Sequence, residues 1–520
     1  MSNKAHDHVH RLVHSMSRAE KRYFKLFTSR HMLGGQSNHQ VLFDAIAAMS
    51  AYDEAALLEQ FKHEAFTHRF AITKRRLYEA ILKSLDAFHA ESSIDARLHR
   101  MVHQVELLHE RALYDDAAKM LQSVRKLAMQ HERHAILAQA LQWERRLLER
   151  ANYAHAATTD LDRILAESRE LTEEQRQLDE LWDVKSRVLI GMYRQGKARN
   201  EQGIAELRAL LDRPIMLDVK KLRSARARFL YHHLHGAATF AIGDMAECLM
   251  HLSNAYDVLT MERERFTDEP HLVLSVLSNL IYVHARLGRY VRAFELLDHF
   301  RSLPALWEMP ETEDLDLKLF CTSTSLEMTI HCQMGAFDKA MELVAPVERG
   351  LAQHQEQLGA VRKAGFYYQL AYIYFGAGQY DRALRWTHKL LNDVRIDESA
   401  EIVCFGRMLD LMAHIERGRK DMLPYALRST ERYLETRGRT YQFEPVFLDM
   451  VHGIMKARNE TAIQDTYRDF MERLLPLECD PLEQVVFDHM DPVAWAESKL
   501  SGRPFAELVR ERALRIGRAA

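Results

Sequence analysis

One stretch of the chain has the residue spacing of a phosphate-binding loop. GMYRQGKA, residues 191–198, matches the pattern GxxxxGK. In such loops the lysine is followed by Ser or Thr, which ligates magnesium, whereas Ala198 follows Lys197 here. The stretch also falls between two expected helices and not between a strand and a helix. The match therefore gives no basis for a nucleotide site.

The 28 histidines raise the question of a metal site. His63 and His68 in KHEAFTH are five residues apart, so their rings point to different helix faces and the geometry of HExxH zinc enzymes fails. His10 and His14 are four apart and would share a face, which allows adventitious binding of a transition metal and favours it over a physiological site. In YHHLHG we expect a mixture of groove-facing and core rings, at His232, His233 and His235. We expect no metal, no cofactor and no catalytic constellation, and hence no enzyme.

Three consecutive cations, Lys74, Arg75 and Arg76, stand at the start of a helix expected over residues 73–89. Cations at a helix N-terminus are disfavoured by about 0.3–1 kcal/mol each, so an anion should lie nearby. With the preceding helix this region, residues 53–89, outlines a helix-turn-helix that would bind nucleic-acid phosphate. Glu79 and Asp86 share the outward face with the cations. We therefore expect the anion to be a carboxylate of this chain or of a partner.

Composition limits the class of protein. A chain of 520 residues exceeds the usual ceiling of about 250–300 residues for one core, so several domains or a repeat array are expected. Gly (20) and Pro (11) are scarce, which favours long helices. The net charge of −3 argues against a globally basic polyanion binder. Five scattered cysteines, a first segment without a signal-peptide core and no long apolar run predict a soluble, cytoplasmic protein outside the membrane.

A turn motif recurs along the chain. It consists of a small residue, one further residue, an aromatic, two residues and then Ala, as in GAGQYDRALRWTHKLL around Gly378, Tyr380 and Ala383. Two other clear copies lie at Gly335 and Gly288. Weaker copies lie at Ala112, Ala151, Gly196, Gly243 and Gly418, and successive positions are 39 to 47 residues apart. A small residue allows a tight turn, and the Ala allows close approach of the next helix.

LAYIYFGAGQYDRALRWTHKLL, residues 370–391, resembles the tetratricopeptide (TPR) repeat. The usual TPR spacing is about 34 residues, so the helices or loops here are longer. The stretches HSMSRAEKRYFKLF, FAITKRRLYEAILKSL and WAESKLSGRPFAELVRER together look like a set of bacterial TPR-like proteins of the Bacteroidetes type. That resemblance implies no particular activity.

The resemblance implies an all-α fold, a right-handed α-solenoid of long TPR-like helical hairpins. We expect an N-terminal helical domain over 1–100, the repeat solenoid over 101–475 and C-terminal capping helices over 476–520. In TPR arrays the first helix of each pair lines a concave groove. Counting back from each turn places these residues in it: Tyr193, Arg194, His233, Phe240, Tyr282, Arg286, Tyr368, Tyr372 and Phe375.

The leading hypothesis is a non-enzymatic scaffold or adaptor that binds a protein or peptide in this groove and is able to form a homo-oligomer. Aromatic and Arg side chains are enriched in binding hot spots, which supports this interpretation. The alternative is a ligand-sensing transcriptional regulator that binds DNA through residues 53–89. A purely structural scaffold is a third option.

Overall fold

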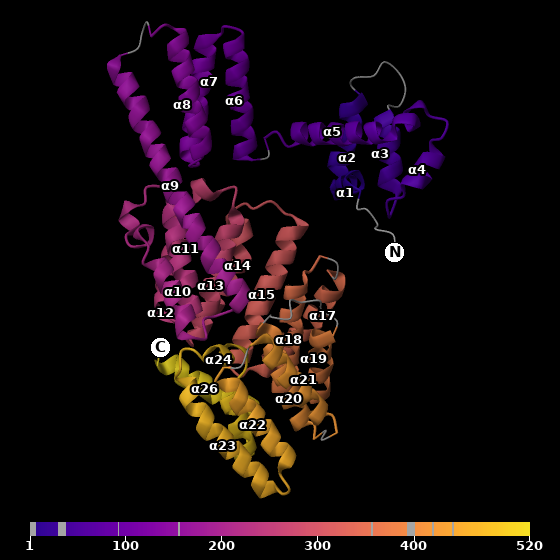
Figure 1. Ribbon diagram of the computed structural model, residues 1–520, viewed down its shortest axis with the longest axis vertical. Coiled ribbons are helices and arrows are strands. Elements are labelled where there is room, and N and C mark those ends of the chain that lie inside the picture. Colours follow the sequence, from indigo (N-terminus) through magenta and orange to yellow (C-terminus); the bar gives the residue numbers. More distant parts are fainter. Residues whose placement is uncertain are drawn as a thin grey trace. The chain divides into compact units, whose positions relative to one another are not determined.

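The structure is a computed structural model, and it describes residues 7–29, 38–91, 93–153, 157–354, 357–392, 401–418, 421–438 and 441–519 (Figure 1). Within these ranges every regular element is a helix and no β-strand occurs, which confirms the all-α class. No helix of the described ranges is both long and apolar enough to span a membrane. The chain forms two compact units, Met1–Leu171 and Thr172–Ala520. This boundary lies inside the span 101–475 that the repeat pattern predicts as one array.

The first unit contains two groups of helices, each with its own apolar core. One core is built around Phe24, Phe43 and Leu77, and the other around Val105 and Leu121. The expected helix over 73–89 begins earlier, at Phe70, whose side chain is buried in the core. The helices are α1 (His8–Ser15), α2 (Arg18–Ser29), α3 (Asn38–Ala48), α4 (Glu54–Gln60), α5 (Phe70–Phe88), α6 (Ile94–Glu110), α7 (Tyr114–Gln130) and α8 (His134–Arg150).

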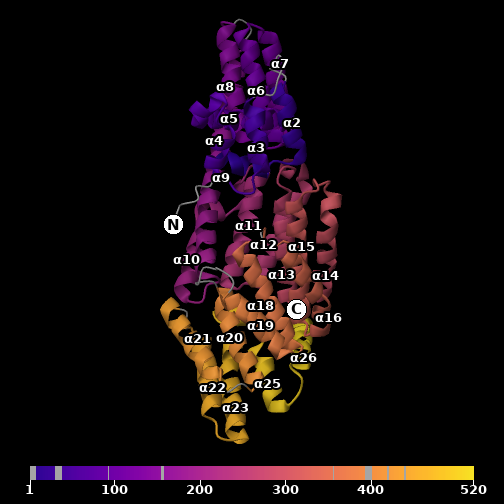
Figure 2. The same cartoon turned by 90° about the vertical axis from the view of Figure 1, so that its right-hand side faces the viewer.

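The second unit is a succession of helices that pack against their neighbours in the sequence (Figures 1 and 2). The long helix α9 (Thr158–Gln195) crosses the boundary between the units. The elements that follow are α10 (Glu201–Leu211), α11 (Ala225–Ile242), α12 (Met245–Met261), α13 (Pro270–Arg286), α14 (Tyr290–Leu306), α15 (Glu313–Gln333), α16 (Phe337–Glu342), α17 (Val344–Gln353), α18 (Ala360–Gly376), α19 (Tyr380–Asn392), α20 (Glu401–Glu416), α21 (Leu423–Arg437), α22 (Phe443–Lys456) and α23 (Glu460–Glu478).

First helices of successive pairs also contact one another. Helix α13 packs on α15, α15 on α18, and α18 on α20. The second helices α14 and α19 each pack on the first helix of their own pair and on the first helix of the next pair. The two main cores run through these pairs, and their largest buried side chains include Phe266, Phe300, Phe337 and Phe405.

The predicted turn motif is confirmed at backbone level. Seven of the eight predicted positions have positive φ: Ala112, Gly196, Gly243, Gly288, Gly335, Gly378 and Gly418. At the eighth position Ala151 has a negative φ, and the next two residues, Asn152 and Tyr153, have positive φ. In the three clear copies the alanine of the motif is fully buried, at Ala293, Ala340 and Ala383. A larger side chain there would separate the two helices of the pair.

The chain ends in three shorter helices, α24 (Val485–His489), α25 (Pro492–Ser501) and α26 (Phe505–Ala519). Asp491 caps α25 by accepting a hydrogen bond from the Ala494 amide, and Pro492 occupies the first helical position. Trp495 is almost fully buried. These residues therefore pack as part of the second unit's core and not as a loose tail.

Two turn glycines provide a matched pair for a stability test. A Cβ on Gly335 would lie 2.6 Å from the Arg510 amide nitrogen and 2.7 Å from the Ala506 carbonyl oxygen, both in α26, whereas a Cβ on Gly378 meets no atom within 4 Å. Both residues have φ near +70° (+67° and +72°). Gly378→Ala should cost about 1–2 kcal/mol from the left-handed backbone alone. Gly335→Ala should cost clearly more in urea unfolding, and equal losses would contradict this packing of α26.

Candidate binding groove

A cavity of about 700 Å³ opens along the first helices of the second unit. Residues from the five first helices α9, α11, α13, α15 and α18 line it, together with Cys248 and Leu252 of the second helix α12. Within a helix the lining residues recur at helical spacing, as in His233, Ala237 and Phe240. Side chains at this spacing share one helix face. Each of these five first helices thus contributes residues from one face to the same cavity.

The lining of this cavity is apolar with small polar groups. Phe240 and Tyr282 form an edge-to-face pair with ring centroids 5.8 Å apart. The polar side chains are mainly hydroxyls and one amide, from Ser275, Ser278, Asn279, Thr322 and Ser325. Arg362 is the one Lys or Arg among the lining residues, and no Asp or Glu is among them. Such a surface offers hydrogen bonds and a single fixed positive charge to a ligand.

A second cavity, of about 820 Å³, continues the first. The two share Tyr282, Ser325, Leu326 and Gly365, so they are two parts of one groove. The second part is bounded by residues of the chain's own C-terminal region, including Phe487, Asp488, His489 and Arg512. Residues 480–491 are called the C-terminal segment. This segment contacts Lys197 after α9, Arg286 at the end of α13 and Tyr368 of α18.

Asp488 anchors the C-terminal segment through two buried ion pairs. Its carboxylate oxygens lie 2.5 Å from Lys197 Nζ and 2.6 Å from Arg286 Nη2. Burial alone would raise the pKa of Asp488, but the charges of Arg286 and Lys197 outweigh it and hold that pKa below its usual value. Arg286 also donates a hydrogen bond to the Phe487 carbonyl oxygen at 2.9 Å. The segment is therefore held by charge and by backbone recognition together.

A second buried cluster supports the start of this segment. Arg199 pairs with Glu444 at 2.6 Å and with Glu483 at 2.5 Å, and all three side chains are at most 5% exposed. Glu483 also accepts a hydrogen bond from the Gln442 amide at 3.0 Å. Burial raises the pKa of the Glu444 carboxyl, which the charge of Arg199 opposes. Arg199, which precedes α10, thus connects Glu444 of α22 to Glu483, which follows α23.

The structure distributes the predicted groove residues over different environments. His233, Phe240 and Tyr282 line the first cavity, and Tyr282, Arg286, Tyr368 and Tyr372 line the second. Tyr368 donates a hydrogen bond to the His489 carbonyl oxygen at 3.1 Å, and Tyr372 accepts one from the Asp491 amide at 3.1 Å. In this structure Arg286, Tyr368 and Tyr372 thus contact the chain's own C-terminal segment.

Of the three other predicted residues, the structure describes the side chain of Phe375. Phe375 lines neither cavity and is 2% exposed, with its ring 5.5 Å from Tyr380 and 5.6 Å from Phe505. It belongs to the packing between helices because α26 covers this end of α18. Tyr193 and Arg194 lie outside the residues whose side chains the structure describes.

Sequence reasoning missed the small polar part of the lining. Asn279 and Ser275 lie on the same face of α13 as Tyr282, and Thr322 and Ser325 lie on one face of α15. The helical spacing from Tyr282 backwards was a signal that would have found Asn279 and Ser275. The small polar residues were not predicted because Ser and Thr are not enriched in binding hot spots.

Two of the three cations in α5, Lys74 and Arg75, pair with carboxylates of the chain itself. Lys74 pairs with Asp7 at 2.8 Å and with Glu54 at 2.7 Å, and Arg75 pairs with Glu79 at 3.0 Å. The expected carboxylate is thus confirmed for Lys74. Because α5 begins at Phe70, the three cations lie in its second turn, where the helix dipole is weaker than expected from the sequence. The Arg75 side chain remains 81% exposed, and Arg76 is exposed as well.

The N-terminal histidines pack as α1 against α3. His10 Nε2 lies 3.1 Å from the Met49 carbonyl oxygen and His14 Nε2 lies 3.3 Å from the Ile46 carbonyl oxygen. Their rings share a face, as their spacing predicts, with centroids 4.2 Å apart. Each ring therefore already uses one nitrogen in holding the two helices together.

Replacing Asp488 tests how the C-terminal segment is held. Asp488→Asn leaves Lys197 and Arg286 buried without their anion, so the free energy of unfolding should fall by about 3–5 kcal/mol at pH 7. The folded pKa of Asp488 is lowered, so its contribution is present above the ordinary value of 3.8 and disappears as the pH falls through the lower folded value. Urea unfolding at a series of pH values measures this.

The control is Asp465→Asn, which removes an exposed carboxylate 2.5 Å from Arg468 and should change stability little. A loss from Asp488→Asn no larger than that of the control would show that the segment is not anchored by its charge.

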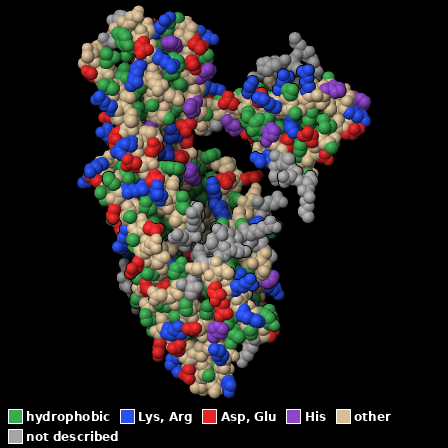
Figure 3. Space-filling model, viewed as in Figure 1, with side chains coloured by type: hydrophobic (Ala, Val, Ile, Leu, Met, Phe, Trp, Pro, Cys, Tyr) green, Lys and Arg blue, Asp and Glu red, His purple; other side chains and the backbone are tan. Residues whose placement is uncertain are grey.

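In comparisons with known proteins, no family model and no curated protein matches this chain. Charged side chains of both signs are interspersed over the surface seen in Figure 3. The groove is distinguished by its lining, which combines aromatic rings, small hydroxyls and the single cation of Arg362.

Proposed function

We propose that the chain is a TPR-like α-solenoid that acts as a non-enzymatic scaffold or adaptor and binds a protein or peptide segment in this groove. One observation carries the proposal: five helices separated in the sequence contribute same-face residues to one continuous cavity. An array of helix pairs produces such a surface when each first helix packs on the next.

The chemistry of the lining fits an extended peptide better than a compact apolar ligand. An extended chain has one amide donor and one carbonyl acceptor per residue, and these groups need partners when they leave water. Ser275, Asn279 and Thr322 offer both donors and acceptors along the groove. Phe240 and Tyr282 offer apolar contact for a side chain of the ligand.

Arg362 favours a proposed ligand that carries a negative charge. It is exposed at the rim of the first cavity, and no carboxylate of the chain lines that cavity. A guanidinium binds a carboxylate by two parallel hydrogen bonds, which favours a ligand with an Asp, a Glu or a free C-terminus at this point. The chain uses the same chemistry internally, because Arg286 holds the carboxylate of Asp488 in the neighbouring part of the groove.

Selection from a displayed library of short random peptides, with the full chain as bait, tests the proposal. Enriched peptides should share an acidic residue or a C-terminal carboxylate and bind in the micromolar range. Arg362→Ala should weaken them about tenfold or more, the effect of losing one charge-assisted hydrogen-bonded pair. Asn279→Trp should abolish binding by filling the cavity. Fluorescence anisotropy with labelled peptides measures both effects.

The matched control is Val291→Trp. Val291 is 77% exposed on α14, the second helix of the pair that carries Asn279, and it does not line the groove. Selected peptides should bind this variant as they bind the wild type. Peptides that bind all three variants equally well would place the binding surface elsewhere and would reject the groove.

A further inference from the structure

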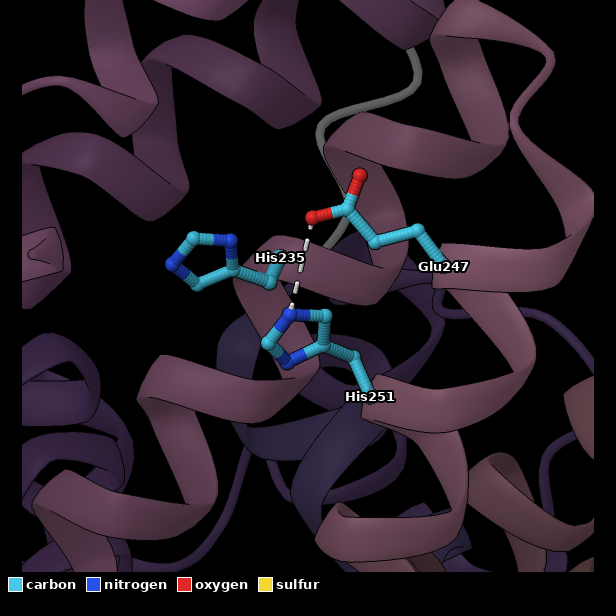
Figure 4. A group of neighbouring side chains, drawn as sticks. All are labelled: His235, Glu247 and His251. Carbon is cyan, nitrogen blue, oxygen red and sulfur yellow. Dashed lines mark ion pairs between the residues drawn. The ribbon is translucent and has the colours of Figure 1, made fainter.

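On the face of α11 opposite the groove, α11 and α12 bring together three side chains of types that bind metal ions. His235 of α11 lies beside Glu247 and His251 of α12, and one ligand atom from each of the three lies within 4.8 Å of the others (Figure 4). Glu247 and His251 are four residues apart and share a face of α12. His233 and Phe240 point from the other side of α11 into the groove. The cluster is therefore separate from the proposed peptide site.

The tautomer of His235 is determined by its surroundings. Its Nε2 lies 3.0 Å from the carbonyl oxygen of Met216, and a carbonyl only accepts, so Nε2 carries the proton. Nδ1 then keeps its lone pair. That atom is buried and has no hydrogen-bond partner in the structure, and the residue is only 9% exposed. A buried acceptor without a donor costs free energy, which a bound cation would recover.

His251 is held in a similar way. Its Nδ1 lies 3.0 Å from Nδ1 of His232, so one of these atoms donates to the other. When His251 donates, its Nε2 keeps a lone pair, and that atom faces a Glu247 carboxylate oxygen at 3.9 Å.

We propose that His235 Nδ1, His251 Nε2 and a carboxylate oxygen of Glu247 bind one divalent transition-metal ion, with Zn²⁺ as the best fit to two imidazoles and one carboxylate. Sites of this composition hold zinc with three protein ligands and leave a position for water. Met216 and His232 hold the outer nitrogens of the two rings, the arrangement that orients ligating histidines in metal sites. The ion joins α11 to α12.

Binding requires a small local movement. Zinc bonds of about 2.0–2.2 Å bring ligand atoms to roughly 3.3 Å from one another, so the cluster must contract. The rings of His235 and His251 are nearly parallel, with an interplanar angle of 12° and centroids 4.4 Å apart. Lone pairs in parallel planes do not converge, and one ring must rotate about its Cβ–Cγ bond, a torsion with a broad energy minimum. Glu247 is exposed on the surface of α12 and is free to close on the ion.

Isothermal titration of the full chain with Zn²⁺, with Co²⁺ absorption as a second readout, tests the site. The wild type should bind one equivalent that Glu247→Gln weakens at least tenfold and that His251→Gln removes. Zn²⁺ should raise the thermal unfolding midpoint of the wild type and leave that of Glu247→Gln unchanged. Because Glu247 is exposed, its replacement keeps the fold intact, which circular dichroism of the metal-free variant checks.

The control variant is His284→Gln. His284 also has a buried Nδ1 without a hydrogen-bond partner, but the charges of Arg289 and Arg292 lie near it. This variant should bind Zn²⁺ as the wild type does. If Glu247→Gln and His284→Gln bind the same number of equivalents with the same affinity, the ion is adventitious, held by other histidines such as His10 and His14, and the proposal is overturned.

Discussion

The carboxylate of Asp488 joins parts of the second unit that are far apart in the sequence. It lies between Lys197, which follows α9, and Arg286, which ends α13. A buried carboxylate is stable only when its charge is compensated, so the segment that carries it must remain between these two cations. That position brings His489 and Asp491 to Tyr368 and Tyr372 of α18. One ionised group thus determines where the C-terminal segment crosses the helix ends.

The shape of the groove depends on that crossing. Helix pairs that contact only their neighbours in the sequence form an array that bends easily, because no contact spans several pairs. The C-terminal segment supplies such contacts, since it bonds to residues at α9, α13 and α18 together. Arg199 adds a second link between Glu444 of α22 and Glu483. These contacts connect three of the groove-lining helices, α9, α13 and α18, through one segment. A groove that is already ordered loses less conformational entropy when a ligand binds.

Local features of this fold follow from the sequence, and long-range ones do not. The turn glycines and the buried alanines Ala293, Ala340 and Ala383 were predictable because a tight turn and a close helix contact restrict a few neighbouring residues. The pairing of Lys197 with Asp488, 291 positions away, has no such local signature. Tyr368 and Tyr372 were therefore placed in an open groove, although the right helix face was identified. The contact of Phe375 with Phe505 was not predictable for a related reason, because no feature of the sequence near Phe375 indicates it.

Helix α11 connects the two proposed sites. Its rotation about its own axis determines how far His233 and Phe240 reach into the groove, and the same rotation places His235 against α12. Gly236 allows the close packing involved, because a Cβ there would lie 3.2 Å from the Leu252 side chain of α12. An ion held by His235 and two residues of α12 would prevent α11 from turning. Metal binding on one face would then reduce the conformational entropy lost when a peptide binds on the other, and the two ligands would favour each other without touching.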